Sequence, residues 1–462
     1  MRVIITSRRN KRYSVRKIYF IVYIVLYFKK EKDEAGGERG GSRPLRPPSA
    51  ELVTHCVVGG AHAFILRISR FFGLAPLSFE SRSAGFTVAI SSAMCIYSYI
   101  LVTILVICTI FGLVAEINVG VDLSVRMSSR MSQVISTCDV LVVVVTAGAG
   151  VYGAPRRMRN MLKFMHHVAN VDTSIGAQYS VITERKLCAI LLAILLFFSV
   201  LLVDDFFFYV MQAKKVDRHW DIVTNYLGFY LLWYVVMILE LQFAFTALSL
   251  RTRFQAVNDA LALTARQISI PLEKESKESV PLNIFAIRVA STETRSANVS
   301  LLVDTITSGD QTVIIRHAGE DIIRLNIDLV VILISTLLHM IVTPYFLIMD
   351  IMFSSHRIHF LVLQFLWCVT HLLRMFVVVE PCHYTITEGK KTESLVCKLI
   401  SLVPSTGALP SRLELFSRQL MLQSVTYTPL GICTLDRPLV ASVLGAVTTY
   451  LVILIQFQRY DN

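Results

Sequence analysis

Seven hydrophobic stretches, each long enough to cross a lipid bilayer, constrain this chain more than any other feature. A transmembrane α-helix needs about 20 predominantly apolar residues to span the hydrocarbon core. The mean hydropathy of +0.59 and the 54% share of hydrophobic residues exclude a soluble globular protein. We therefore predict an all-α membrane protein with seven transmembrane helices. The predicted spans are residues 86–114, 132–152, 187–210, 223–248, 329–349, 359–381 and 438–457.

The loops between these spans alternate in their content of Lys and Arg. The loops after the first, third and fifth spans hold two, three and one basic residues, whereas those after the second, fourth and sixth hold six, nine and six. Basic residues collect on the cytoplasmic side of a membrane. The pattern therefore predicts a cytoplasmic N-terminus and an extracellular C-terminus, which is the reverse of a G-protein-coupled receptor. The long connection at 251–328 is then cytoplasmic, and its glycosylation sequon at Asn298 stays bare.

The remaining sequence argues against several other classes of protein. Residues 1–63 are basic and contain an apolar run of only eleven residues, at 18–28, so we interpret them as a disordered or membrane-surface extension. The net charge of +12 is spread over loops and does not predict a nucleic-acid site. The nine cysteines lack metal-ligand spacing, and no catalytic constellation is present. We predict neither an enzyme nor a cofactor.

The last span carries a stripe of polar side chains at a spacing of seven residues, made by Ser442, Thr449 and Gln456. On a helix of about 3.6 residues per turn, this spacing keeps the three side chains on one face. A polar stripe inside a membrane must face protein or water. Two interpretations remain open from the spacing alone: the stripe lines an aqueous path, or it makes hydrogen bonds to a neighbouring helix.

The same span carries a motif. Residues 449–457 read Thr-Tyr, five apolar residues, then Gln-Phe, which resembles the signature of insect gustatory receptors. Three further segments resemble that family in the same order along the chain: SRFFGLAP at 69–76, LRTRFQ at 250–255 and FSRQL at 416–420. The resemblance indicates a seven-span chemoreceptor domain at residues 64–459.

The resemblance implies a function and an assembly. In this family four subunits, identical or not, each contribute the seventh span to a central cation pore. Gln456 and Phe457 are then expected at the gate, where a ring of Phe side chains can dewet a narrow pore. Tyr450 is expected to pack against a neighbouring span. The implied protein is a tastant-gated, non-selective cation channel in the plasma membrane of gustatory neuron dendrites. The alternative is a seven-span taste receptor that signals through a soluble transducer.

The outward halves of the third, fourth and sixth spans supply candidate ligand residues. In the fourth span, aromatic residues recur at i, i+4 and i+7 and share one face. Aromatic faces can cover the apolar side of a sugar or a planar bitter compound, and a carboxylate can bind its hydroxyl or cationic groups. The other reading is an aromatic core with solvated carboxylates at the membrane edge. The candidates are Asp204, Asp205, Tyr226, Tyr230, Trp233, Gln364, Trp367 and His371.

Two further expectations concern buried polar groups. Arg374 lies inside the sixth span, where a charge needs a partner, and Glu240 lies at a similar depth in the fourth. We predict that they form a structural ion pair or that Arg374 binds backbone carbonyls. Weaker candidates for the ligand pocket are Gln133, Asp139, His339 and Tyr345.

Overall fold

The computed structural model describes residues 55–58, 60–82, 85–119, 124, 127, 130–175, 178–269, 326–353, 358–402, 409–422 and 425–461. They belong to one compact unit, Val53–Asn462. The predicted N-terminal extension falls outside the described residues apart from positions 55–58 and 60–63, as does most of the long connection, including Asn298.

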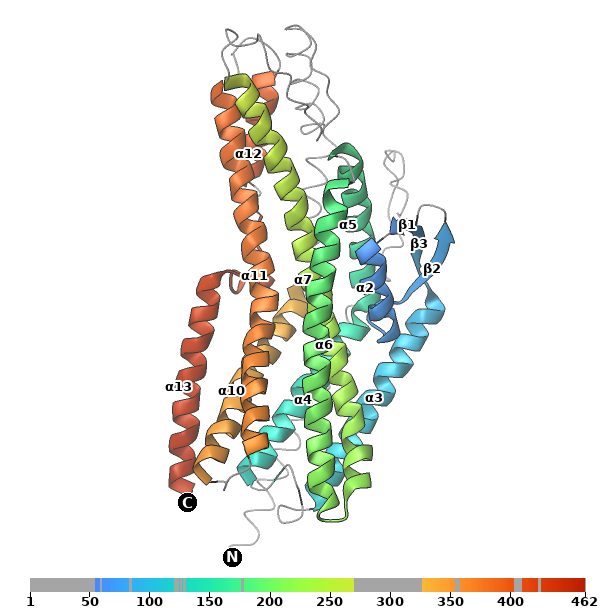
Figure 1. Ribbon diagram of the computed structural model, residues 1–462, viewed down its shortest axis with the longest axis vertical. Helices are drawn as coiled ribbons and strands as arrows, with labels where there is room; N and C mark the ends of the chain where they lie inside the picture. The colour runs from blue at the N-terminus through green and yellow to red at the C-terminus, as the bar shows by residue number, and fades with distance from the viewer. Residues whose placement is uncertain are drawn as a thin grey trace, which may run out of the picture. The chain divides into compact units, whose positions relative to one another are not determined.

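Seven helices in the described part of the chain are long and apolar enough to cross a membrane, and each coincides with a predicted span (Figure 1). The seven-span prediction is therefore confirmed. The helices are α3 Ser92–Val119, α4 Arg130–Tyr152, α6 Gln178–Lys214, α7 His219–Ser269, α10 Asn326–Phe353, α11 Ile358–Leu402 and α13 Arg437–Asp461.

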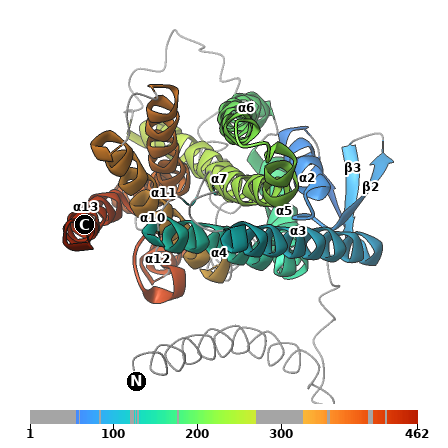
Figure 2. The ribbon, with the colours of Figure 1, turned by 90° about the horizontal axis from the view of Figure 1, so that it is seen from below.

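Helix α7 is the centre of the bundle. In its most apolar window 83% of the residues are buried, against 28% in α3 and α6. Figure 2 shows α7 between α6 on one side and α3 and α4 on the other, and α11 packs along its length. A helix that is apolar on every face is expected to be buried all round. The core cluster accordingly draws many residues from α7, among them Phe229, Leu232, Val236 and Leu239.

Two glycines allow α3 and α7 to approach closely. A Cβ atom added to Gly112 of α3 would lie 2.1 Å from the backbone oxygen of Asn225 in α7. One added to Gly228 of α7 would lie 2.9 Å from Thr109 Oγ1 of α3. Small residues at such crossings let membrane helices pack by close backbone contact. This crossing therefore fixes α3 against the central helix.

Helices α7 and α11 run well beyond a membrane-spanning length, with 51 and 45 residues. The connection after the fourth span therefore begins as a continuation of α7, and the connection after the sixth span also begins as helix, since α11 passes through Pro381. Side-chain bonds join the two extensions: Asn258 Nδ2 lies 2.9 Å from Glu388 Oε2, and Thr392 Oγ1 lies 2.7 Å from Asn258 Oδ1. Helix α12, Leu409–Leu422, packs against them through Leu413 and Phe416 (Figure 1).

The prediction of an all-α fold is wrong at the N-terminal side of the domain. Strands β1 His55–Val58, β2 Leu77–Arg82 and β3 Gly85–Ile90 form an antiparallel sheet in the order β1-β3-β2. Helix α2, Gly60–Phe71, connects the first two strands. The predicted first span began at 86, yet β3 occupies 85–90 and α3 begins at Ser92. Because β3 is apolar and runs directly into α3, hydropathy alone does not separate the strand from the helix.

Candidate functional site

A buried carboxylate joins three of the helices that carry candidate ligand residues. Asp205 of α6 is 5% exposed and accepts a short hydrogen bond from Tyr230 Oη of α7. The indole Nε1 of Trp367 in α11 donates to its other carboxylate oxygen at 3.2 Å. Two donors, one from α7 and one from α11, therefore converge on one carboxylate of α6. We call Asp205, Tyr230, Trp233, Trp367 and His371 the aspartate–aromatic cluster.

Trp233 lies at the centre of this cluster. Its ring centroid is 5.6 Å from that of Trp367 and 5.8 Å from that of His371. The Arg374 guanidinium lies over its face, 4.8 Å from the centroid, which is a cation–π contact. Tyr230 and Trp233, two of the three residues at this spacing in α7, thus present an aromatic face toward α6 and α11. The cluster presents aromatic surface, a carboxylate and an imidazole within one group of contacts.

Two of the weaker candidates join the same group. His339 of α10 stacks on His371, with the ring centroids 5.2 Å apart and the planes at 14°. His339 Nε2 lies 3.0 Å from Asp139 Oδ1 of α4. The polar contacts therefore extend from α6 and α7 through α11 to α10 and α4. Of the other two weaker candidates, Gln133 is half-buried and Tyr345 is 2% exposed.

The predicted pairing of Arg374 with Glu240 is confirmed. The guanidinium Nε and Nη2 atoms of Arg374 lie 3.0 and 2.6 Å from the two carboxylate oxygens of Glu240, which makes a bidentate pair. Both side chains are at most 1% exposed. Arg374 Nη1 also lies 3.2 Å from His371 Nδ1. The pair therefore underlies the aspartate–aromatic cluster and fixes α11 to α7 beneath it.

Three of the predicted ligand residues do not join the cluster. Asp204 is 47% exposed and lies 3.4 Å from His359, so it lies on the outer surface of α6. Adjacent residues of a helix point about 100° apart, which is why Asp205 turns inward and Asp204 does not. Tyr226 and Gln364 are buried, at 4% and 7% exposure, and are not counted in the cluster as defined here.

The polar stripe of α13 lies on the side of the helix that faces away from the bundle. Val440 and Val447 pack against Met340 of α10 and Met375 of α11, while only 11% of the α13 span is buried. Ser442, Thr449 and Gln456 are all exposed. The two hydroxyls donate to the carbonyls four residues earlier, at 3.1 and 3.0 Å. Their oxygen lone pairs therefore face outward, where they could accept a donor or contact a cation.

The expected packing of Tyr450 against a neighbouring span is at most partial within the single chain, and packing against a span of another subunit stays a prediction. Its side chain is 54% exposed, because position 450 lies at the edge of the face that packs on α10 and α11. The side chain of Phe457, the other expected gate residue, lies outside the described residues. The pore-facing candidates within the described residues are thus the stripe itself and Tyr450 beside it.

A link at the start of α13 was missed by the sequence analysis. His383 of α11 contacts the carboxylate of Asp436, and Arg437 Nε donates to Glu380 Oε1 at 2.9 Å. The backbone N–H of Arg437, followed by His383, lowers the pKa of Asp436 below its usual value. Only the density of charges at these positions could have indicated this link, since its partners lie 53 and 57 residues apart.

Comparison with known proteins identifies the family. The model of the 7tm chemosensory receptor family matches residues 62–299 and 324–460. The chain belongs to this family. It is therefore a multi-pass membrane protein of chemosensory receptor type, and the predicted resemblance to insect gustatory receptors is confirmed.

Two relatives of this chemosensory receptor come from Drosophila melanogaster. It is 28% identical over 432 residues to the gustatory receptor for sugar taste 43a, which covers 86% of this chain and 98% of that protein. It is 34% identical over 89 residues to the putative gustatory receptor 28b, about 19% of either chain.

A solved structure has the same fold. The insect olfactory receptor OR5 from Machilis hrabei superimposes with a TM-score of 0.56 at 12% identity, covering 86% of this chain and 97% of that one. The same receptor in complex with eugenol superimposes with a TM-score of 0.54.

Proposed function

We propose that this chemosensory receptor is a tastant-gated, non-selective cation channel and that its tastant is a sugar. The observation that carries the proposal is the convergence of Tyr230 and Trp367 on the buried carboxylate of Asp205. Sugars present hydroxyl donors beside an apolar C–H face, which suits a carboxylate among aromatic rings. The extended similarity to a receptor named for sugar taste supports this class over a bitter compound.

Sugar binding at the aspartate–aromatic cluster would change how α11 packs on α6 and α7. In the structure, the donors of Tyr230 and Trp367 already satisfy Asp205, so a sugar hydroxyl must compete with them. An exchange of donors would loosen α11 from α6 and α7 above the Arg374–Glu240 pair. Helix α11 packs on α13 through Met375 and Val379, so its movement reaches the polar stripe. A difference of about 1–3 kcal/mol in sugar affinity between closed and open states is a typical coupling.

The pore is assigned to α13, with four subunits around it. Since α13 leaves Ser442, Thr449 and Gln456 uncovered within one chain, other copies or related subunits can complete a shared aqueous path. Gln456 and Phe457 form its gate, and the C-terminus lies outside the cell. The location is the plasma membrane of gustatory neuron dendrites.

Whole-cell recording in a heterologous cell without added G protein tests the proposal. We expect an inward cation current on application of one member of a panel of mono- and disaccharides. A tag after Asn462 is expected to bind antibody on intact cells, and Asn298 is expected to carry no glycan. Receptor at the cell surface that gives currents only when a G protein is supplied would replace the proposal with the transducer-coupled alternative.

A further inference from the structure

A small cavity lies away from the aspartate–aromatic cluster, where α5, Ala154–Ile175, and α10 meet α7. Its volume is about 30 Å³, and its wall is mostly apolar. Leu239, Phe243, Leu329 and Ile332 form much of this wall. Trp233 and Leu239 are six residues apart on α7, which corresponds to about 9 Å along the helix axis. The cavity is therefore separate from the proposed sugar site.

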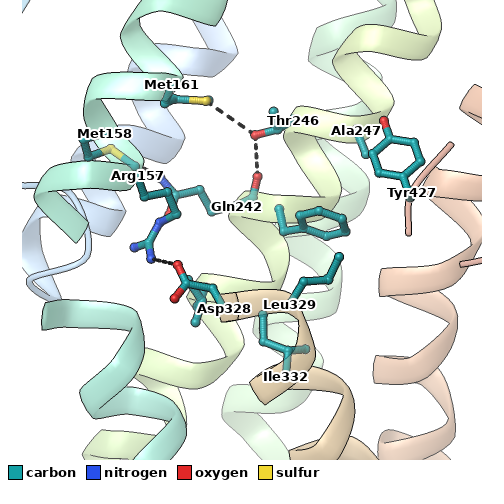
Figure 3. A pocket seen from close by; sticks show the side chains of 12 residues that line it. Arg157, Met158, Met161, Gln242, Thr246, Ala247, Asp328, Leu329, Ile332 and Tyr427 are labelled. Atoms are coloured by element: carbon teal, nitrogen blue, oxygen red, sulfur yellow. Dashed lines mark hydrogen bonds and ion pairs between the residues drawn. The ribbon is translucent and has the colours of Figure 1, made fainter. Parts of the chain in front are cut away.

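One end of the cavity carries two polar atoms that have no hydrogen-bond partner among the described residues. They are Nε of Arg157 and Oε1 of Gln242, on side chains that are 8% and 4% exposed. Gln242 Nε2 contacts the sulfur of Met158, the neighbour of Arg157, so both atoms lie at the same end (Figure 3). Ala247 and Tyr427 lie at the other end. A buried polar group left unpaired destabilises the folded protein, and a ligand that pairs with it would remove that cost.

The charge at this end is already balanced. Arg157 Nη1 lies 2.8 Å from Asp328 Oδ2 and 2.9 Å from the carbonyl oxygen of Gly150, and Nη2 donates to the carbonyl of Leu74 at 3.2 Å. An anionic ligand would therefore compete with Asp328 for the same guanidinium. Among the described residues, one N–H donor and one amide oxygen acceptor remain unpaired at this end, and the hydroxyl of Tyr427 remains unpaired at the other end. A hydroxyl group serves the N–H donor and the amide acceptor, because it accepts one hydrogen bond and donates another.

We propose that this cavity binds a short aliphatic alcohol. The hydroxyl accepts from Arg157 Nε and donates to Gln242 Oε1, and the alkyl chain lies against Leu329 and Ile332. The volume corresponds to about two water-sized molecules, so a chain of about two or three carbons fits it. Met158 and Met161 line the same wall, and unbranched thioether side chains can shift to admit a longer chain.

Occupancy of the cavity reaches the segment that leads into α13. Tyr427 is 4% exposed, and its carbonyl accepts from the N–H of Leu435 at 2.9 Å, two residues before α13 begins. The wall of the cavity therefore includes the segment that leads into the last helix. The site is a point of entry for a modulator that does not compete with a tastant.

Protection of an introduced cysteine tests the site on the full chain in lipid nanodiscs. Ile332→Cys places a thiol in the cavity, and Ile334→Cys places one on the same helix at a position that is 52% exposed. Each variant is treated with methyl methanethiosulfonate, with and without 1-propanol, and labelling is followed by peptide mass spectrometry. We expect 1-propanol at about twice its dissociation constant to slow labelling at 332 by about threefold and to leave 334 unchanged.

Further variants separate a failure to fold from a failure to bind 1-propanol. Leu329→Cys tests the same wall if Ile332→Cys fails to fold. Adding Gln242→Leu removes the acceptor and is expected to reduce protection to less than about half of its original extent. Equal labelling with and without 1-propanol would leave water as the occupant and overturn the proposal. A thiol at 332 that stays unlabelled while the thiol at 334 reacts fully would also overturn the proposal. The readout needs no current, so it holds even if the proposed channel function fails.

Discussion

Helices α7 and α13 are both apolar enough to cross a membrane, yet the chain uses them in opposite ways. In the most apolar window of α7, 83% of the residues are buried, whereas in α13 the share is 11%. Helix α7 carries its polar groups inward, where Tyr230 and Glu240 meet partners on α6 and α11. Helix α13 carries its polar groups outward. Apolar composition thus marks a helix as membrane-spanning without telling whether its partners lie in the same chain.

The largest effect on stability is expected from Arg374→Met. This change leaves the carboxylate of Glu240, which is fully buried, without its partner. Breaking a buried pair from one side costs about 3–5 kcal/mol. We expect little folded receptor by fluorescence-detected size-exclusion chromatography. The double variant Arg374→Met/Glu240→Met should recover much of the loss, and a double variant as unstable as the single one would contradict this account.

A smaller loss is expected from Gly112→Ala. The added methyl group would lie 2.1 Å from the Asn225 oxygen, so α3 must move away from α7. Overpacking of this kind costs about 1–3 kcal/mol. The matched control is Gly445→Ala in α13, where an added Cβ meets no atom within 4 Å among those described. Thermal midpoints measured on both variants should fall only for Gly112→Ala. Equal thermal midpoints for the two variants would contradict the close contact of α3 with α7 at Gly112.

An intermediate effect is expected at the proposed sugar site. Asp205→Asn removes the negative charge that would strengthen a hydrogen bond from a sugar hydroxyl, and such a loss is worth about 1–2 kcal/mol. We expect the half-maximal sugar concentration to rise by about tenfold in whole-cell recordings. Asp204→Asn is the control, because Asp204 is half exposed and should shift the same value little. A larger shift from Asp204→Asn would place the ligand on the outer surface of α6.

The smallest effect on stability is expected from Gln456→Ala and Phe457→Ala. Substitutions on an exposed face usually change the free energy of unfolding by less than about 0.5 kcal/mol. Surface expression should therefore match that of the unmodified receptor. Basal current or gating should nevertheless change, because these residues are assigned to the gate. Unchanged currents in both variants would count heavily against that assignment.

Hydropathy was sufficient to predict the seven spans, because a bilayer imposes a length and a composition on every helix that crosses it. The orientation inferred from loop charge stays a prediction. Hydropathy was not sufficient for the sheet at 55–90. Strand β3 and the start of α3 are both apolar, and the pairing of β3 with β1 joins residues about thirty positions apart. Such pairing depends on contacts that a local pattern does not contain.

At the candidate site, too, some contacts could be predicted from the sequence and others could not. The spacing of Tyr230 and Trp233 predicted a shared face, and the depth of Arg374 predicted its partner. The choice between Asp204 and Asp205 could not be made, because it depends on the rotation of α6 relative to α11. The same holds for His383 with Asp436, and for the cavity beside Gln242, which depends on how four segments fit together.

The length of α7 has a mechanical consequence. Its 51 residues measure about 77 Å, so roughly 45 Å project past a bilayer core of about 30 Å. Hydrogen bonds from Asn258 to Glu388 and Thr392 hold this projection against α11, so we expect the extensions of α7 and α11 to move together. A tilt of about 5° within the bilayer would displace its far tip by about 4 Å. A slight rearrangement within the bilayer thereby becomes a displacement at the tip that a protein bound there would sense or resist.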